Sequence, residues 1–201
     1  PSKRIIDLSI KALNNMSHRG ASAADDFTGD GSGILVDIPF GYFNKILKEE
    51  FYLSVNDDYG IGMVFANSEK LEELKGLFKT NAKKLGLGLL AVRMVPVDTA
   101  VLGDIAKSSC PEIVQFFIKQ VEESKYDLET LLYLLRKIIE CEMDNSDGFI
   151  CSLSSKTIVY KGLTKPNQLY RFYSDLPHPE FKVKISVFHE RFSTNTSSSW
   201  D

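Results

Sequence analysis

The sequence is poor in the residues that build metal centres and disulfide frameworks. It holds only three cysteines and three histidines in 201 residues. Cys110, Cys141 and Cys151 are odd in number and lack the spacing of zinc ligands, so we expect reduced thiols in a cytoplasmic protein. Cys141 and Cys151 are expected to be buried structural thiols. No metal site is predicted, because the histidines are not spaced as ligands with any carboxylate: His18, His178 and His189.

Long apolar runs and an excess of positive charge are also missing. No segment approaches the roughly 20 apolar residues of a membrane span, and no signal-peptide pattern opens the chain. The net charge of −3 and the isoelectric point near 5.7 argue against a nucleic-acid partner, which requires neutralisation of phosphates. Hydrophobic residues at 43% and charged residues at 25% are typical of a soluble globular protein with neither kind of partner.

Hydrophobic periodicity predicts a mixture of helices and strands in no regular order. Helices are expected at 4–18, 40–49, after an N-cap at Ser68 up to Gly86, after an N-cap at Asp127, and at 166–173. Strands are expected at 34–38, 59–66, 87–97 and 113–118, in a hairpin of 149–153 with 157–160, and at 183–192. Because the order follows no βαβ rhythm, we predict a single α+β domain over residues 1–201, with about eight strands or fewer and helices on both faces.

The glycine-rich segment 29–33, Gly-Asp-Gly-Ser-Gly, superficially suggests a dinucleotide-binding loop. That fingerprint needs a strand before it and a helix after it. Here a predicted helix precedes the segment and a predicted strand follows it. We therefore interpret residues 29–33 as a tight turn that sets the register of the first strand.

The most informative stretch lies near the end of the chain, where Arg191 is followed by small polar residues. Those residues are Ser193, Thr194, Asn195 and Thr196. A guanidinium beside hydrogen-bonding side chains is suited to a small ligand with a carboxylate. The alternative is a surface arginine at a strand end followed by an ordinary polar loop. Alternation in a strand places Ile185, Val187, His189 and Arg191 on one side and Phe188, Glu190 and Phe192 on the other. Periodicity alone leaves the two interpretations open.

The segment His18-Arg19-Gly20 also has two interpretations. Basic residues in a last helical turn followed by glycine are typical of a helix C-terminus. Alternatively, Arg19 lies at the mouth of a pocket, where its charge would lower the pKa of a nearby thiol.

Three separated stretches resemble one family. They are residues 15–35, which contain Met-Ser-His-Arg-Gly-Ala and Thr-Gly-Asp-Gly-Ser-Gly; residues 150–162, Ile-Cys-Ser-Leu-Ser-Ser-Lys-Thr-Ile-Val-Tyr-Lys-Gly; and residues 191–196, Arg-Phe-Ser-Thr-Asn-Thr, with Trp200-Asp201. Residues 95–98 and 101–103 give a weaker fourth match. In this order they resemble the glutaminase domain, a class II glutamine amidotransferase, of glutamate synthase large subunits.

The resemblance implies a fold and a chemistry. The fold is the N-terminal-nucleophile αββα sandwich, in which two antiparallel sheets lie between helical layers. Arg191 would bind the α-carboxylate of glutamine, Ser193, Thr194 and Asn195 would line the substrate site, and Arg19 would lie near the nucleophile as the catalytic residue. An N-terminal cysteine thiolate would attack the amide, form a thioester and release ammonia. No cofactor is implied in this domain, since flavin and an iron–sulfur cluster are expected only in a synthase partner or domain.

The sequence departs from the family at both ends and beside Arg191. The nucleophile strand would precede Pro1, and the Asn-Gly pair of the oxyanion hole would follow Asp201, so we expect a domain incomplete at both ends. Glu190 replaces the usual serine, and strand alternation predicts that it points away from Arg191 with little effect. The competing hypothesis is a non-catalytic module that binds glutamine or supports an assembly.

Overall fold

A computed structural model describes residues 1–17, 27–144, 147–191 and 199–200. The described residues form seven strands in two sheets, a three-stranded sheet in the order β6-β1-β7 and a four-stranded sheet in the order β3-β4-β2-β5. The chain divides into two compact units that interleave in sequence. The first unit comprises Pro1–Gly41, Val95–Cys110 and Val159–Trp200, and the second comprises Tyr42–Met94 and Pro111–Ile158.

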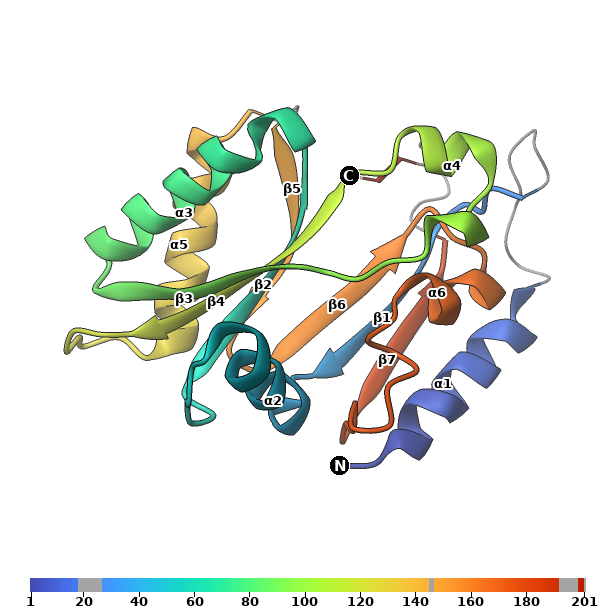
Figure 1. Cartoon of the computed structure of the whole chain (residues 1–201), viewed down its shortest axis with the longest axis horizontal. Helices are drawn as coiled ribbons and strands as arrows, with labels where there is room; N and C mark the ends of the chain where they lie inside the picture. Colours follow the sequence, from blue (N-terminus) through green and yellow to red (C-terminus); the bar gives the residue numbers. More distant parts are fainter. Residues whose placement is uncertain (18–26, 145–146, 192–198, 201) are drawn as a thin grey trace. The chain divides into compact units, whose positions relative to one another are not determined.

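The predicted helices and strands occur in the expected order, and one helix that the sequence did not predict, α4, is added between β3 and β4 (Figure 1). The α-helices are α1 (Lys3–Asn15), α2 (Phe40–Phe51), α3 (Leu71–Lys84), α4 (Asp104–Ser108), α5 (Leu128–Glu142) and α6 (Pro166–Phe172). The strands are β1 (Ser32–Asp37), β2 (Tyr59–Ala66), β3 (Leu87–Met94), β4 (Glu112–Gln120), β5 (Gly148–Ser154), β6 (Thr157–Gly162) and β7 (Ser186–Glu190). The predicted α+β class with two antiparallel sheets is confirmed.

In the first unit, α1 and α6 lie together on one face of the β6-β1-β7 sheet (Figure 1). The apolar stripe of α1 buries Ile6, Ile10 and Leu13, three residues at helical spacing. Ser2 begins the helix, because its side chain accepts a hydrogen bond from the backbone N–H of Arg4. The helix ends at Asn15, before the predicted boundary at His18, which lies outside the described residues.

In the second unit, α3 and α5 lie side by side on one face of the β3-β4-β2-β5 sheet (Figure 1). Phe78 of α3 stacks on Phe116 of β4 with ring centroids 3.9 Å apart. The periodic leucines of α5 complete this core, and Leu132 and Leu135 are fully buried. As predicted, Asp127 caps α5 by accepting a hydrogen bond from the N–H of Thr130 at 2.8 Å.

Strands β5 and β6 are not the hairpin that the sequence predicts. β5 pairs with β2, whereas β6 belongs to the other sheet. The turn between them is held instead by Glu129 at the start of α5. Its carboxylate accepts hydrogen bonds from the side chain of Ser154 and from both the backbone and the side chain of Ser155. In a hairpin, pairing between the two strands would hold this turn. Here the carboxylate of Glu129, from another element, holds it instead.

Three smaller expectations also need correction. Asn67, rather than Ser68, provides the side-chain cap, and a short 3₁₀ turn over Ser68–Lys70 precedes α3. Cys141 is exposed rather than buried, because it lies on the outer face of α5, and Cys151 is only partly buried.

Strand β7 is shorter than the predicted 183–192. Before it, the backbone N–H groups of Lys184 and Ile185 donate to the carboxylate of Asp37 instead of a neighbouring strand. After Glu190, the backbone turns into a positive φ of 120° at Arg191. The strand therefore ends one residue before the arginine that the sequence highlighted.

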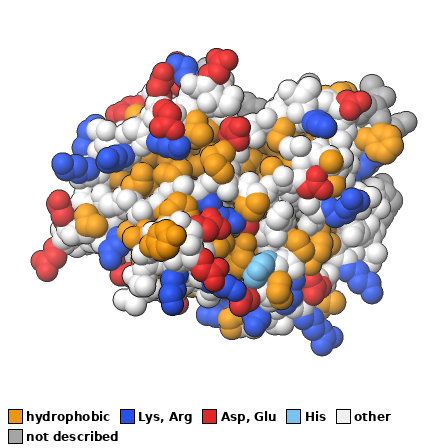
Figure 2. Space-filling model, viewed as in Figure 1, with side chains coloured by type: hydrophobic (Ala, Val, Ile, Leu, Met, Phe, Trp, Pro, Cys, Tyr) orange, Lys and Arg blue, Asp and Glu red, His pale blue; other side chains and the backbone are white. Residues whose placement is uncertain are grey.

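The distribution of charged side chains on the surface is consistent with the small net charge of the sequence. Figure 2 shows basic and acidic side chains intermixed over the visible face. Among the described residues, no helix is long and apolar enough to cross a membrane.

Candidate functional site

The glycine-rich segment forms a turn that is fastened to its surroundings on several sides. The side chain of Thr28 accepts a hydrogen bond from the N–H of Ala106 at 3.2 Å. The buried hydroxyls of Ser32 and Thr164 are 2.7 Å apart. Gly29 packs so closely on the backbone that a Cβ atom there would lie 2.7 Å from the nitrogen of Lys165. This packing requires glycine at position 29, where the segment bends before the first strand, β1.

Arg191 is attached to this turn through both its backbone and its side chain. Its N–H donates to the carbonyl of Gly31 at 2.8 Å. Its Nε lies 3.2 Å from a carboxylate oxygen of Asp30. The Nε atom is buried and donates no hydrogen bond to a described residue, so Asp30 attracts it mainly by charge. The turn therefore holds the cation at the end of β7.

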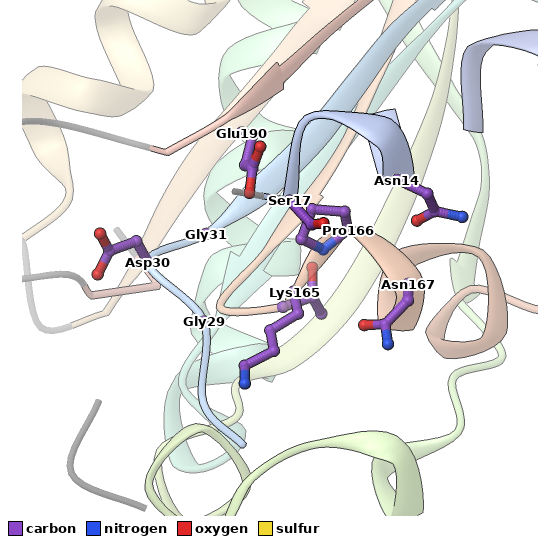
Figure 3. Close-up of a pocket in the computed structure, with 10 residues that line it drawn as sticks. Asn14, Ser17, Gly29, Asp30, Gly31, Lys165, Pro166, Asn167 and Glu190 are labelled. Atoms are coloured by element: carbon purple, nitrogen blue, oxygen red, sulfur yellow. The ribbon is translucent and has the colours of Figure 1, made fainter. Parts of the chain in front are cut away.

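A cavity of about 240 Å³ lies beside the turn. It is smaller than the roughly 300–1,000 Å³ typical of sites for drug-sized ligands, and it therefore suits a small molecule. Its lining comes from α1, the turn, the start of α6 and the end of β7: Asn14, Ser17, Gly29, Asp30, Gly31, Thr164, Lys165, Pro166, Asn167 and Glu190 (Figure 3). All of these residues belong to the first unit.

Charged groups of both signs line or border this cavity. In Figure 3 the carboxylate of Asp30 points away from Asn14 and Asn167, toward the other side of the turn. Glu190 lines the cavity, and both of its carboxylate oxygens are buried. The expectation that Glu190 points away from Arg191 with little effect stays a prediction. Strand alternation does not continue past Glu190, because Arg191 leaves the extended conformation.

His189 lies next to this region on β7 and is partly buried. Burial, together with the charge of Lys161 on β6, lowers the pKa of His189 below its ordinary value. The neutral imidazole is therefore favoured near neutral pH, so this side chain adds no positive charge to that of Arg191.

Trp200, one of the two described residues that follow the polar stretch, is anchored in the same unit. Its indole N–H donates to the carbonyl of Ala106 at 3.1 Å, and its ring centroid lies 5.8 Å from that of Phe172. Ala106 also donates its own N–H to Thr28. Helix α4 thus connects the glycine-rich turn to Trp200.

Of the residues highlighted by the sequence, only Arg191 lies within the described part of the chain. Arg19, Ser193, Thr194 and Asn195 lie outside it. Sequence reasoning missed the cavity residues Asn14, Lys165 and Asn167, for which no local pattern gives a signal. Asp30 was a detectable candidate, since an acidic residue within a glycine-rich turn is held on a short, constrained backbone.

The whole chain matches a family of known proteins. Residues 1–201 fit the family described as "Glutamine amidotransferases class-II". The chain is 40% identical over 204 residues to a ferredoxin-dependent glutamate synthase of Pyropia yezoensis, which covers 98% of this chain and 13% of that protein. It is 39% identical over 203 residues to the large chain of a glutamate synthase [NADPH] of Bacillus subtilis. The match covers 98% of this chain and 13% of that protein.

A third relative is a glutamate synthase [NADH] of Saccharomyces cerevisiae. It is 38% identical over 219 residues, which cover all of this chain and 10% of that protein. The chain therefore spans between a tenth and a seventh of the length of the relatives it matches.

Proposed function

Because the chain belongs to the class-II glutamine amidotransferases, we propose that it is the glutaminase part of a glutamate synthase. In this role it hydrolyses the side-chain amide of glutamine and supplies ammonia for glutamate synthesis. The similarity to three glutamate synthases over nearly the whole chain supports this assignment. A synthase domain or subunit is then the partner, and the flavin and iron–sulfur cluster belong to that partner and not to this domain. The compartment that we propose is the cytoplasm.

The observation that carries the proposal is the attachment of Arg191 to the glycine-rich turn. A guanidinium held by the turn that lines a small cavity binds the α-carboxylate of glutamine as a charge-assisted pair. In the same proposal, Ser193, Thr194 and Asn195 provide polar contacts to the substrate, and Arg19 lies near the nucleophile. The polar lining of the cavity from Asn14, Ser17 and Asn167 is compatible with a polar amino-acid substrate.

The chemistry proposed is nucleophilic catalysis by the thiolate of an N-terminal cysteine. The sulfur attacks the amide carbon, ammonia leaves, and water hydrolyses the resulting thioester to glutamate and the free thiol. All three cysteines of this sequence are internal residues. None of these three is proposed as the nucleophile.

Substitution of Arg191 tests the substrate role directly. In the full-length protein, Arg191→Ala should raise the KM for glutamine about 100-fold, since breaking a charge-assisted pair costs about 3 kcal/mol. The KM of Arg191→Lys should lie between that of the unmodified protein and that of Arg191→Ala, because an ammonium group keeps the positive charge but lacks the planar fork of a guanidinium. Arg171→Ala, which removes an exposed arginine of α6 in the same unit, is the matched control. Unchanged glutamine affinity of Arg191→Ala in calorimetry would contradict the proposal.

A further inference from the structure

We propose that Asp30 is a positioning residue that holds the guanidinium of Arg191 in place for the substrate carboxylate. This inference rests on the proposed function, because it assigns a role to a neighbour of the substrate-binding arginine. It concerns a carboxylate that does not itself contact the substrate and acts only through Arg191.

The first support is that two contacts to Arg191 come from adjacent residues of one turn. The carbonyl of Gly31 binds the backbone N–H of Arg191 at 2.8 Å, and Asp30 lies 3.2 Å from its Nε. The backbone contact fixes where the side chain starts, and the ion pair fixes the direction in which it extends. Arg191 needs such support, because a positive φ of 120° is unfavourable for a residue with a side chain.

The second support is that Asp30 is itself firmly placed. Gly31, its neighbour, has a φ of 104°, which only glycine adopts readily. Contacts of the turn with Ala106, Thr164 and Lys165 hold the backbone on either side of Asp30. An aspartate has a short side chain with few rotamers, so a fixed backbone gives a fixed carboxylate.

The third support is that Asp30 leaves part of Arg191 accessible. The side chain of Arg191 is 37% exposed, although its Nε is buried beside Asp30. The accessible surface therefore lies on its other atoms. A guanidinium has five N–H donors, so a carboxylate beside Nε still leaves the terminal nitrogens for a second carboxylate.

A competing role for Asp30 makes the opposite prediction. A carboxylate beside Arg191 also neutralises its charge. If Asp30 only competed with the substrate carboxylate for Arg191, it would weaken glutamine binding. Loss of the Asp30 charge would then lower the KM for glutamine. If Asp30 positions Arg191, the KM rises instead, because a long arginine side chain that is free to move loses more entropy on binding.

The test is Asp30→Asn in the full-length protein, with two amides as substrates. We expect kcat/KM for glutamine to fall about tenfold, mainly through KM, as a preorganised ion pair is lost. For 4-aminobutanamide, which lacks the α-carboxylate, kcat/KM should change less than about twofold, because Arg191 has no partner on this substrate. Asp104→Asn, which neutralises an exposed acid of the same unit, is the control for charge alone.

The outcomes separate this inference from the proposed function. An equal loss for both substrates would mean that Asp30 has a general structural role, and a lower KM for glutamine would mean competition; either result overturns the inference. In an Arg191→Ala background, Asp30→Asn should have no further effect on glutamine, even if the single variant is less stable. If Arg191→Ala itself leaves glutamine use unchanged, the proposed function fails. If Arg191→Ala impairs glutamine use but Asp30→Asn leaves kcat/KM for glutamine unchanged, only the positioning role of Asp30 is contradicted.

Discussion

We predict that the carboxylate of Glu190 opposes the binding of an anion at the end of β7. It is the immediate neighbour of Arg191, it lines the cavity, and both of its oxygens are buried. Partial removal from water strengthens its repulsion of a substrate carboxylate, because the effective dielectric constant falls. A serine, the residue usual in the family at this position, carries no such charge. The chain should therefore bind glutamine less tightly than it would with serine at position 190.

We expect Glu190→Ser to lower the KM for glutamine about threefold with little change in kcat, since a charge near the protein surface contributes a fraction of a kcal/mol to a few kcal/mol. Glu190→Gln separates charge from size, because it removes the charge and nearly keeps the volume. The two variants should behave alike in steady-state kinetics of the full-length protein. An unchanged KM in both would show that the charge of Glu190 is not felt at the substrate site.

At the scale of single residues, the sequence singled out Arg191 but not its surroundings, and the substrate-binding role of Arg191 stays a prediction. Residue type and a polar neighbourhood identify a possible anion-binding arginine. The ion pair with Asp30 depends on contact between residues separated by more than 150 positions, and no local periodicity encodes such a contact. The orientation of Glu190 relative to Arg191 stays a prediction, because alternation applies only while the backbone remains extended, and Arg191 leaves that conformation.

The turn between β5 and β6 depends on one carboxylate from a different element. Burial raises the pKa of Glu129, but hydrogen bonds from Ser155 and Ser154 outweigh it and hold the pKa below its ordinary value. The contribution to folding stability is present in full above the unfolded pKa of about 4.3, and it is lost as pH falls through the lower folded value.

We expect Glu129→Gln to reduce the free energy of unfolding near pH 6.5 by about 1 kcal/mol, less than the usual contribution of about 1.5–3 kcal/mol for hydrogen bonds to a charged group, because the side chain is partly exposed. The difference from the unmodified protein should shrink when urea unfolding is repeated at a series of pH values below the unfolded pKa of about 4.3, as the pH falls through the lower folded pKa. Glu123→Gln, which alters an exposed glutamate in the loop before α5, is the control. A difference independent of pH would argue against the ionised carboxylate as the cause.

At the scale of elements, helices were predicted more reliably than strand pairing. The apolar spacing in α5 and its Asp127 cap are local features, and both appear in the structure as predicted. Strand β2 also has its predicted bounds, Tyr59–Ala66. The partner of a strand is a non-local property, so a short connection over Ser154, Ser155 and Lys156 gave a false indication of a hairpin. The cap supplied by Glu129 has no signature in the sequence of the turn itself.

At the scale of the whole molecule, the chain passes repeatedly between two units. The α+β class followed from the mixture of periodicities, and the order of strands within each sheet did not. In the four-stranded sheet, β4 lies between β3 and β2 although it follows both in sequence. In the three-stranded sheet, β1 lies between β6 and β7, which come more than 100 residues later. Each sheet therefore needs strands from both halves of the chain.

This interleaving predicts that neither half folds alone. A cut between Cys110 and Pro111 separates β2 and β3 from β4 and β5, and β1 from β6 and β7. In the fragment 1–110, β2 and β3 lose the strand that joins them, and isolated strands are not stable in water. Each fragment should therefore melt without a cooperative transition in circular dichroism, whereas the two refolded together should regain one, because every strand pair is restored. A cooperative transition in fragment 1–110 by itself would contradict the strand order on which the turn and Arg191 depend.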